Sequence, residues 1–102
     1  MKATEKHCLE TYKAYLENND SKYAYVNELV KPCTEKAVVV SLVCYDFETK
    51  KDCDIYFWIP RKYSYYNRSN GCNAKIPKWL AIKNIEKCLE QEKTNFLAVV
   101  NR

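Results

Sequence analysis

Cysteine and histidine are the side chains in this sequence that could act as nucleophiles, general bases or metal ligands. The sequence has six cysteines and a single histidine, His7. Cys8 follows His7 directly, but neighbouring side chains on a helix project about 100° apart, so the two do not form a ready thiolate–imidazole pair. No two cysteines have the C-x-x-C spacing of thioredoxin-like sites and zinc ribbons. We therefore expect neither an enzyme nor a metal-binding protein.

Motifs that bind phosphate or calcium are missing as well. Phosphate-binding loops need glycine where the backbone approaches the ligand closely, and Gly71 is the only glycine in 102 residues. Acidic side chains cluster in residues 46–54, but they lack the regular ligand spacing of a calcium loop. The sequence therefore predicts no cofactor, and we interpret the acidic cluster as a charged, solvated hairpin tip.

The stretch RKYSYYNRSN, residues 61–70, mixes tyrosines with cationic side chains. In a nucleic-acid-binding protein such cations contact phosphates, while tyrosine rings stack on unpaired bases. The candidates for this role are Arg61, Lys62, Tyr65, Tyr66 and Arg68. Alternate tyrosines could instead face inward and hold a long loop, because tyrosine often packs its ring and keeps its hydroxyl hydrated. The net charge of +4 favours acidic partners only slightly.

Hydrophobic patterning predicts an α+β fold in one domain, residues 1–102, with a small antiparallel sheet and two helices. Thr4 is expected to cap the first helix, and Pro32 to follow the end of the first strand. No apolar run approaches the ~20 residues of a membrane span, so no membrane association is expected. The expected elements are a helix over 5–18, a strand over 22–30, a hairpin over 36–60, an irregular segment over 61–75, a helix over 77–91 and a strand over 95–100.

The hairpin has a predicted register, with its turn near Glu48 and Thr49. Placing Cys44 opposite Cys53 makes one face of the hairpin entirely apolar and the other amphipathic, and a slip of one residue would invert the two faces. Directly opposed residues lie within disulfide range, so a Cys44–Cys53 bridge is a hypothesis. The alternative is a pair of reduced cysteines packed in the core as small hydrophobic residues.

The two predicted helix–strand units align without gaps when Ala81 is placed on Cys8. An internal duplication would explain this match, although any two amphipathic helices can be aligned by phase. Two similar halves would leave a groove between them, and exposed strand edges there could accept a partner's chain. We therefore predict a protein–protein interaction module that holds a partner or its extended peptide, with nucleic-acid binding through residues 61–68 as the alternative. The candidate partner-binding residues are Trp58, Tyr63, Tyr65, Tyr66 and Trp79.

Short length, one glycine, many tyrosines and lysines, and cysteines without a motif resemble the small orphan proteins of filamentous viruses that infect hyperthermophilic archaea. Tyrosine-rich stretches such as KYSYYNRSN suggest an Acidianus filamentous virus in particular. The resemblance implies a viral protein with a binding role in the host cytoplasm, where disulfides persist in such organisms. The N-terminal MKATEKHCLE lacks the hydrophobic core of a signal peptide, and a secreted, disulfide-stapled inhibitor is the alternative.

Overall fold

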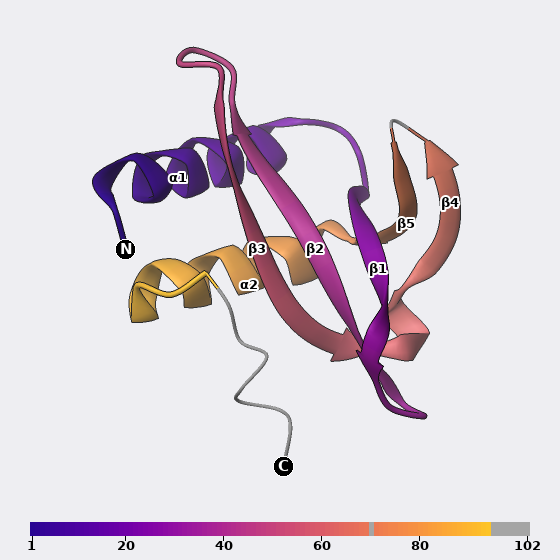
Figure 1. Cartoon of the computed structure of the whole chain (residues 1–102). Coiled ribbons are helices and arrows are strands. Elements are labelled where there is room, and N and C mark those ends of the chain that lie inside the picture. The colour runs from indigo at the N-terminus through magenta and orange to yellow at the C-terminus, as the bar shows by residue number, and fades with distance from the viewer. Residues whose placement is uncertain (70, 95–102) are drawn as a thin grey trace.

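The computed structural model describes residues 1–69 and 71–94, and in this part of the chain two α-helices lie on one face of a five-stranded antiparallel sheet (Figure 1). The strand order is β3-β2-β1-β5-β4. The predicted α+β class is therefore confirmed. The elements are α1 (Ala3–Asn18), β1 (Tyr23–Cys33), β2 (Ala37–Asp46), β3 (Lys51–Pro60), the short 3₁₀ helix η1 (Arg61–Tyr63), β4 (Tyr65–Ser69), β5 (Cys72–Pro77) and α2 (Lys78–Gln91).

The β2–β3 hairpin has the predicted register, with Cys44 opposite Cys53 and the ladder continuing to Ala37 and Pro60. The alternation of apolar residues sets this register, because a slip of one residue would expose the whole buried face. That face forms the largest part of the core under α1 and α2. Its buried members from the hairpin are Val38, Val40, Leu42, Cys44, Cys53, Ile55, Phe57 and Ile59.

The two helices complete the core with one apolar stripe each. Cys8, Leu9 and Leu16 of α1 are buried, as are Ile85 and Cys88 of α2. The two stripes that suggested a duplication thus pack against the same face of the sheet, but this arrangement does not confirm a duplication. The strand predicted over 95–100 lies outside the described residues. In the part of the chain that the structure describes, no helix is long and apolar enough to cross a bilayer.

The ends of two predicted elements differ from expectation. Helix α1 begins at Ala3, one residue before the predicted cap Thr4, and the Lys2 N–H donates to Glu5 Oε1 at 3.0 Å. That bond satisfies an N-terminal donor from inside the helix, so a threonine cap is not needed. Strand β1 continues through Pro32 to Cys33, because the register shifts between Glu28 and Cys33 and proline is tolerated at such a bulge.

The prediction that residues 61–75 form an irregular segment is wrong. It forms η1 and most of the β4–β5 hairpin, with Gly71 at φ 78° in the turn. Alternation of apolar residues does not mark β4, because the strand lies at the sheet edge and carries tyrosine, asparagine and arginine. Edge strands of this kind are stabilised by pairing on one side alone.

Strand β1 changes partner along its length. Its first residues, Tyr23 to Val26, pair with β5, and pairing with β2 begins at Asn27, which lies opposite Ser41. The sheet therefore consists of two three-stranded parts, β3-β2-β1 and β1-β5-β4, that share β1. On the far side of the Asn27–Ser41 pair, β1 and β2 separate, and the C-terminal end of α1 lies beside β2 at the top of the gap (Figure 1).

Candidate functional site

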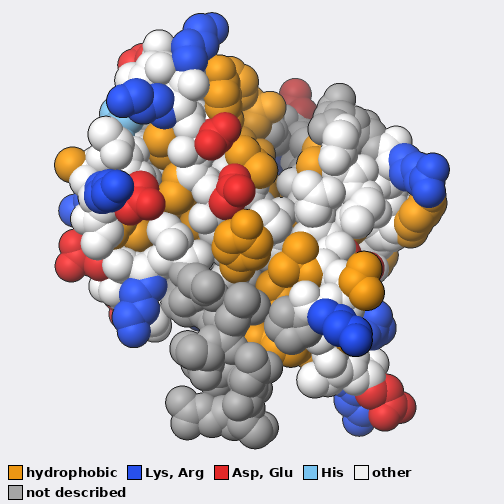
Figure 2. All heavy atoms as spheres, in the orientation of Figure 1, with side chains coloured by type: hydrophobic (Ala, Val, Ile, Leu, Met, Phe, Trp, Pro, Cys, Tyr) orange, Lys and Arg blue, Asp and Glu red, His pale blue; other side chains and the backbone are white. Residues whose placement is uncertain are grey.

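A cleft of about 510 Å³ lies where β1 and β2 separate. Its volume is within the range of ligand pockets in proteins. Figure 2 shows the molecule in the orientation of Figure 1, and hydrophobic side chains gather there near the top of the β2–β3 hairpin and across the middle of the sheet. The lining residues come from α1, β1, β2, β5 and the hairpin turn, and all are uncharged: Tyr12, Tyr15, Tyr25, Asn27, Ser41, Val43, Tyr45, Phe47 and Cys72.

A row of aromatic rings forms one wall of the cleft. The rings of Tyr12 and Tyr15 stack with centroids 5.5 Å apart, and Phe47 lies 5.3 Å from Tyr15 and 5.0 Å from Tyr45. Phe47 remains 57% exposed and Tyr15 45% exposed. Contiguous exposed aromatic surface is uncommon on soluble proteins and marks interaction sites, where aromatic side chains are frequent anchors.

The β2 edge of the cleft presents backbone groups that β3 does not use. In an antiparallel strand, residues whose N–H and C=O point to one neighbour alternate with residues whose groups point to the other. The backbone carbonyls of Lys36 and Asp46 accept hydrogen bonds from the backbone N–H groups of Arg61 and Lys50, respectively, which lie on the β3 side. The even-numbered residues of β2 therefore face β3. Val43 and Tyr45 direct their N–H and C=O groups into the cleft.

The β1 edge offers fewer free groups. The side-chain amide of Asn73 in β5 accepts from the Glu28 N–H at 2.7 Å and donates to the Glu28 C=O at 3.3 Å, so even-numbered residues of β1 face β5. Tyr23 and Tyr25 consequently face the cleft. The Ser21 hydroxyl contacts both backbone groups of Tyr23, at 3.2 and 2.8 Å. Tyr25 is thus left as the residue of this edge whose groups have no partner among residues 1–69 and 71–94.

Two titratable groups of the cleft, Tyr12 and Cys72, have pKa values raised above their ordinary range. Burial is the main reason that the pKa of Tyr12 is raised to about 12, so its hydroxyl stays protonated. Burial also raises the pKa of Cys72, which keeps this side chain a thiol rather than a nucleophilic thiolate. The cleft is therefore suited to binding uncharged, largely apolar groups and not to nucleophilic chemistry.

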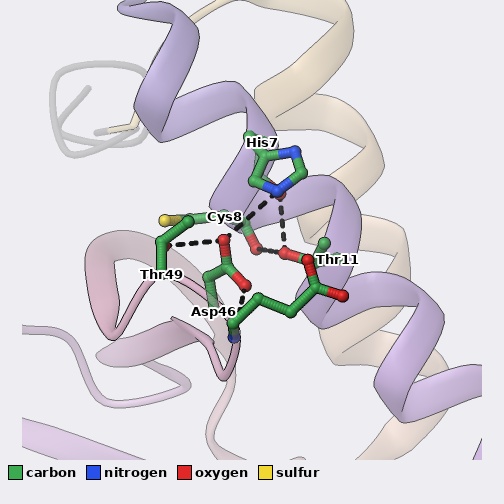
Figure 3. Close-up of polar contacts among 6 residues, drawn as sticks. His7, Cys8, Thr11, Asp46 and Thr49 are labelled. Atoms are coloured by element: carbon green, nitrogen blue, oxygen red, sulfur yellow. Dashed lines mark hydrogen bonds and ion pairs between the residues drawn. The ribbon is translucent and has the colours of Figure 1, made fainter.

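A polar cluster holds the hairpin turn against α1 (Figure 3). Asp46 is 1% exposed and accepts bonds from the Thr49 hydroxyl at 2.8 Å and the Glu48 N–H at 3.0 Å. The same carboxylate oxygen that accepts from Thr49, Asp46 Oδ2, also lies 3.2 Å from His7 Nε2. These bonds, the Thr49 hydroxyl first among them, hold the pKa of Asp46 below its ordinary value. The interpretation of Asp46 as part of a solvated turn is therefore wrong, and the cluster fixes the position of Phe47 beside Tyr15.

This cluster lacks the arrangement of a catalytic cysteine site. Burial raises the pKa of Cys8, and the neighbouring carboxylate of Asp46 raises it further, so the thiolate is disfavoured. The His7 side chain contacts Asp46, and the backbone carbonyl of His7 accepts a hydrogen bond from the Thr11 hydroxyl. We interpret His7, Asp46 and Thr49 as a structural clamp between α1 and the hairpin turn.

The tyrosine-rich stretch does not form one continuous surface. The Arg61 guanidinium donates to the carbonyls of Thr34 at 2.6 Å and Glu35 at 3.2 Å, so it braces the β1–β2 loop. Tyr65 and Tyr66 alternate across β4 and therefore point to opposite faces of the sheet. Tyr66 is 75% exposed, and the Arg68 guanidinium lies 6.0 Å from its ring.

The predicted partner-binding residues are likewise distributed over the surface. Tyr63 and Trp79 lie edge to face at 5.4 Å, with Lys62 Nζ 5.3 Å above the Tyr63 ring, and Tyr65 contacts Tyr23 at 5.8 Å. Trp58 is on β3, and its Nε1 is buried without a hydrogen-bond partner in the described part of the chain. None of these five predicted residues is among the cleft-lining residues.

Sequence reasoning did not identify the cleft residues as a site. Tyr15 has the phase of the buried stripe of α1, so its 45% exposure is not visible in the helical pattern. Phe47 lies in a turn, where a single exposed aromatic residue carries little information. The one sequence feature that pointed to the cleft was the unequal spacing of apolar residues in β1. This spacing indicates a cleft only once it is known that β1 pairs with both β5 and β2.

The structure contains Cys44 and Cys53 as free thiols, and the predicted bridge is not formed. Side chains directly opposite each other in a regular ladder have Cβ atoms about 4.5–5.5 Å apart, whereas a disulfide needs about 3.8 Å. Burial is the main cause that raises the pKa of Cys53 to about 11 and of Cys88 to about 12, and it also raises the pKa of Cys44. The buried cysteines therefore pack as small hydrophobic residues.

Within residues 1–69 and 71–94, no group of three or more histidine, cysteine, aspartate or glutamate side chains is arranged to hold a metal ion. Comparisons of the chain with protein-family models, with curated proteins and with solved structures found no match.

Proposed function

We propose that this protein is a protein–protein interaction module that binds an extended segment of a partner in the cleft between β1 and β2. The observation that supports the proposal most strongly is an uncharged cleft of about 510 Å³ with an exposed aromatic wall. Uncharged lining residues suit a polypeptide with apolar side chains better than a phosphate backbone, which requires cations. The viral setting and the non-enzymatic role that the sequence predicts stay predictions.

The aromatic wall is held in place before any partner arrives. Tyr12 belongs to the border of the core, and the clamp at Asp46 fixes the turn that carries Phe47. A wall that is already ordered loses little side-chain entropy on binding, so more of the contact free energy contributes to affinity. Tyr15 and Phe47 are therefore the residues that we expect to contribute most to the affinity.

The proposal can be tested with a library of random heptapeptides displayed on phage and selected against the immobilised protein. We expect the wild type to enrich peptides that bind in solution, and the Tyr15→Ala, Phe47→Ala double variant to bind them at least tenfold more weakly. The matched control is Trp79→Ala, which removes an aromatic side chain that is 53% exposed and does not line the cleft. Equal loss in the control and the double variant, or no enrichment from the library, would contradict the proposed function.

Nucleic-acid binding remains the second candidate function, and one observation favours it. Tyr66 is strongly exposed on an edge strand beside Arg68, an arrangement in which a base could stack on the ring while the cation contacts a phosphate. Lys75 Nζ also lies 4.4 Å above the ring of Tyr23, near Tyr65. These two contacts lie on opposite faces of the β4 edge, since Tyr65 and Tyr66 alternate along the strand, and each offers a small basic and aromatic surface whose residues do not line the cleft.

A further inference from the structure

We infer that the partner segment is inserted as an additional β-strand between β1 and β2, antiparallel to β2. The inference rests on the proposed function and adds how the segment is held and what chemistry it must have. An extended polypeptide that joins a sheet gains affinity from main-chain hydrogen bonds and specificity from alternate side chains. Both contributions are provided by the two sides of this cleft.

The main-chain contribution comes chiefly from β2. Val43 and Tyr45 are separated by one residue, and their cleft-facing N–H and C=O groups, which have no partner within residues 1–69 and 71–94, repeat with the spacing that an extended backbone requires. Val43 is 40% exposed, which leaves its edge accessible to another chain. On β3, directly opposite, Asp54 pairs with Val43, so the far side of this stretch of β2 is already occupied. The cleft side is the one that an incoming strand can use.

The β1 edge fixes how deeply the segment can enter. The Ser21 hydroxyl occupies the groups of Tyr23, and Asn27 already pairs with Ser41, so Tyr25 alone remains to bond the incoming strand. Because β1 and β2 are antiparallel to each other, the segment must run parallel to one of them. Antiparallel pairing is slightly more stable per residue and β2 offers two residues against one, so the segment runs antiparallel to β2.

The specificity comes from the two environments that alternate side chains of the inserted strand would enter. Side chains on the helix-covered face of the sheet meet Tyr12 and Tyr15 of α1, and those on the opposite face meet Val43 and Tyr25, which alternate with core residues of their strands and are exposed. The positions on the helix-covered face therefore require apolar residues, and those on the opposite face tolerate polar ones. The partner segment is thus a short extended stretch with alternating apolar residues, without proline at the positions that bond β2.

The inference is tested on the tightest-binding heptapeptide from the phage selection, synthesised with one N-methylated amide at a time. N-methylation removes the N–H donor, so methylation at the two amides that bond Val43 and Tyr45, which lie two positions apart, is expected to weaken binding about tenfold, and methylation at amides that bond neither β2 nor Tyr25 much less. A peptide held only by its side chains would show no such period of two, and that result would overturn strand insertion. It would leave the proposed function standing, because the peptide would still bind in the cleft.

A matched pair of protein variants gives a second test. Val43→Pro removes an N–H that faces the cleft, and Asp54→Pro removes an N–H on the outer edge of β3, directly opposite. Both residues turn their N–H groups away from the β2–β3 ladder, so the two variants should lose similar stability. We expect Val43→Pro to weaken binding of the same heptapeptide about tenfold and Asp54→Pro to leave it within twofold. Equal affinities of the two variants would contradict the inference.

Discussion

The two halves of β2 differ in what lies beside them, although the strand itself is regular throughout. From Val38 to Ser41, β2 lies between β3 and β1, and every residue is buried. From Val43 onward it has β3 on one side, and on the other a cleft whose wall is the aromatic face of α1. Because α1 covers the face of the sheet and does not pair with this half of β2, the core stays closed, while one backbone edge of β2 has no partner in the described part of the chain. The same strand thus supplies stability in its first half and, in our proposal, a binding edge in its second.

The comparison is tested most strongly by two adjacent residues of β2. Leu42 is fully buried, so Leu42→Ala is expected to lower the free energy of unfolding by about 2–5 kcal/mol. Val43→Ala removes a partly exposed side chain and should cost less than about 1 kcal/mol. Urea denaturation followed by tryptophan fluorescence measures both. Similar losses at the two positions would show that the second half of β2 is as closely packed as the first.

Thiol labelling examines the same contrast between closed core and open surface. Cys33 is exposed, whereas Cys8, Cys44, Cys53 and Cys88 are buried with pKa values raised by burial. We expect a thiol reagent at neutral pH to modify Cys33 at once and the four buried thiols only at the rate of unfolding. Mass spectrometry of the modified peptides assigns each site. Rapid modification of Cys44 or Cys53 would mean that the core beneath the hairpin opens readily.

The clamp at Asp46 links stability to pH. Its pKa is lowered from the ordinary value of 3.8, so the ionised carboxylate stabilises the native state at pH values above 3.8. This contribution is lost as the pH falls through the lower pKa of the folded state. We expect the melting temperature of the wild type to fall more steeply below pH 4 than that of Asp46→Asn. Parallel curves for the two proteins would show that the clamp does not depend on the charge of Asp46.

The smallest expected effect is that of salt on peptide binding. Because the cleft is uncharged, raising the salt concentration from about 50 to about 200 mM should change the affinity of the selected heptapeptide less than twofold. Fluorescence anisotropy with labelled single-stranded DNA and RNA under the same conditions tests the alternative function. Steep, salt-sensitive binding that is lost in a Tyr65→Ala, Tyr66→Ala, Arg68→Ala variant would instead favour nucleic acid as the ligand.

How much of the fold could be predicted depended on how many faces of each strand are buried. The β2–β3 register followed from the alternation at Val38, Val40 and Leu42, since one slipped residue would have exposed all of them. Strand β4 was missed because an edge strand with Tyr65 and Tyr66 on opposite faces carries no such alternation. The alternation of apolar residues predicts a strand whose one face is buried, but it does not reveal an edge strand that is stabilised by pairing with a single neighbour.

The candidate site was less predictable than the fold for a related reason. A groove with exposed strand edges was expected, but the residues assigned to it, Trp58 and Trp79 among them, lie elsewhere. The cleft exists because β1 pairs with β2 only from Asn27 onward, while its earlier residues, Tyr23 to Val26, pair with β5 on the other edge, and this divergence from β2 depends on tertiary contacts. Exposure of Tyr15 and Phe47 follows from the same separation, so it could not be read from the periodicity of α1 or the hairpin.

Hydrogen exchange of individual backbone amides, followed by NMR with and without the selected heptapeptide, tests whether a strand enters the cleft. We expect the amides of Val43, Tyr45 and Tyr25 to exchange rapidly in the free protein and to become protected when the peptide binds. The amide of Tyr56, which donates to the Thr94 carbonyl on the outer edge of β3, should be unchanged. If the peptide binds and the amides of Val43 and Tyr45 still exchange as fast as before, the cleft between β1 and β2 does not accept a strand.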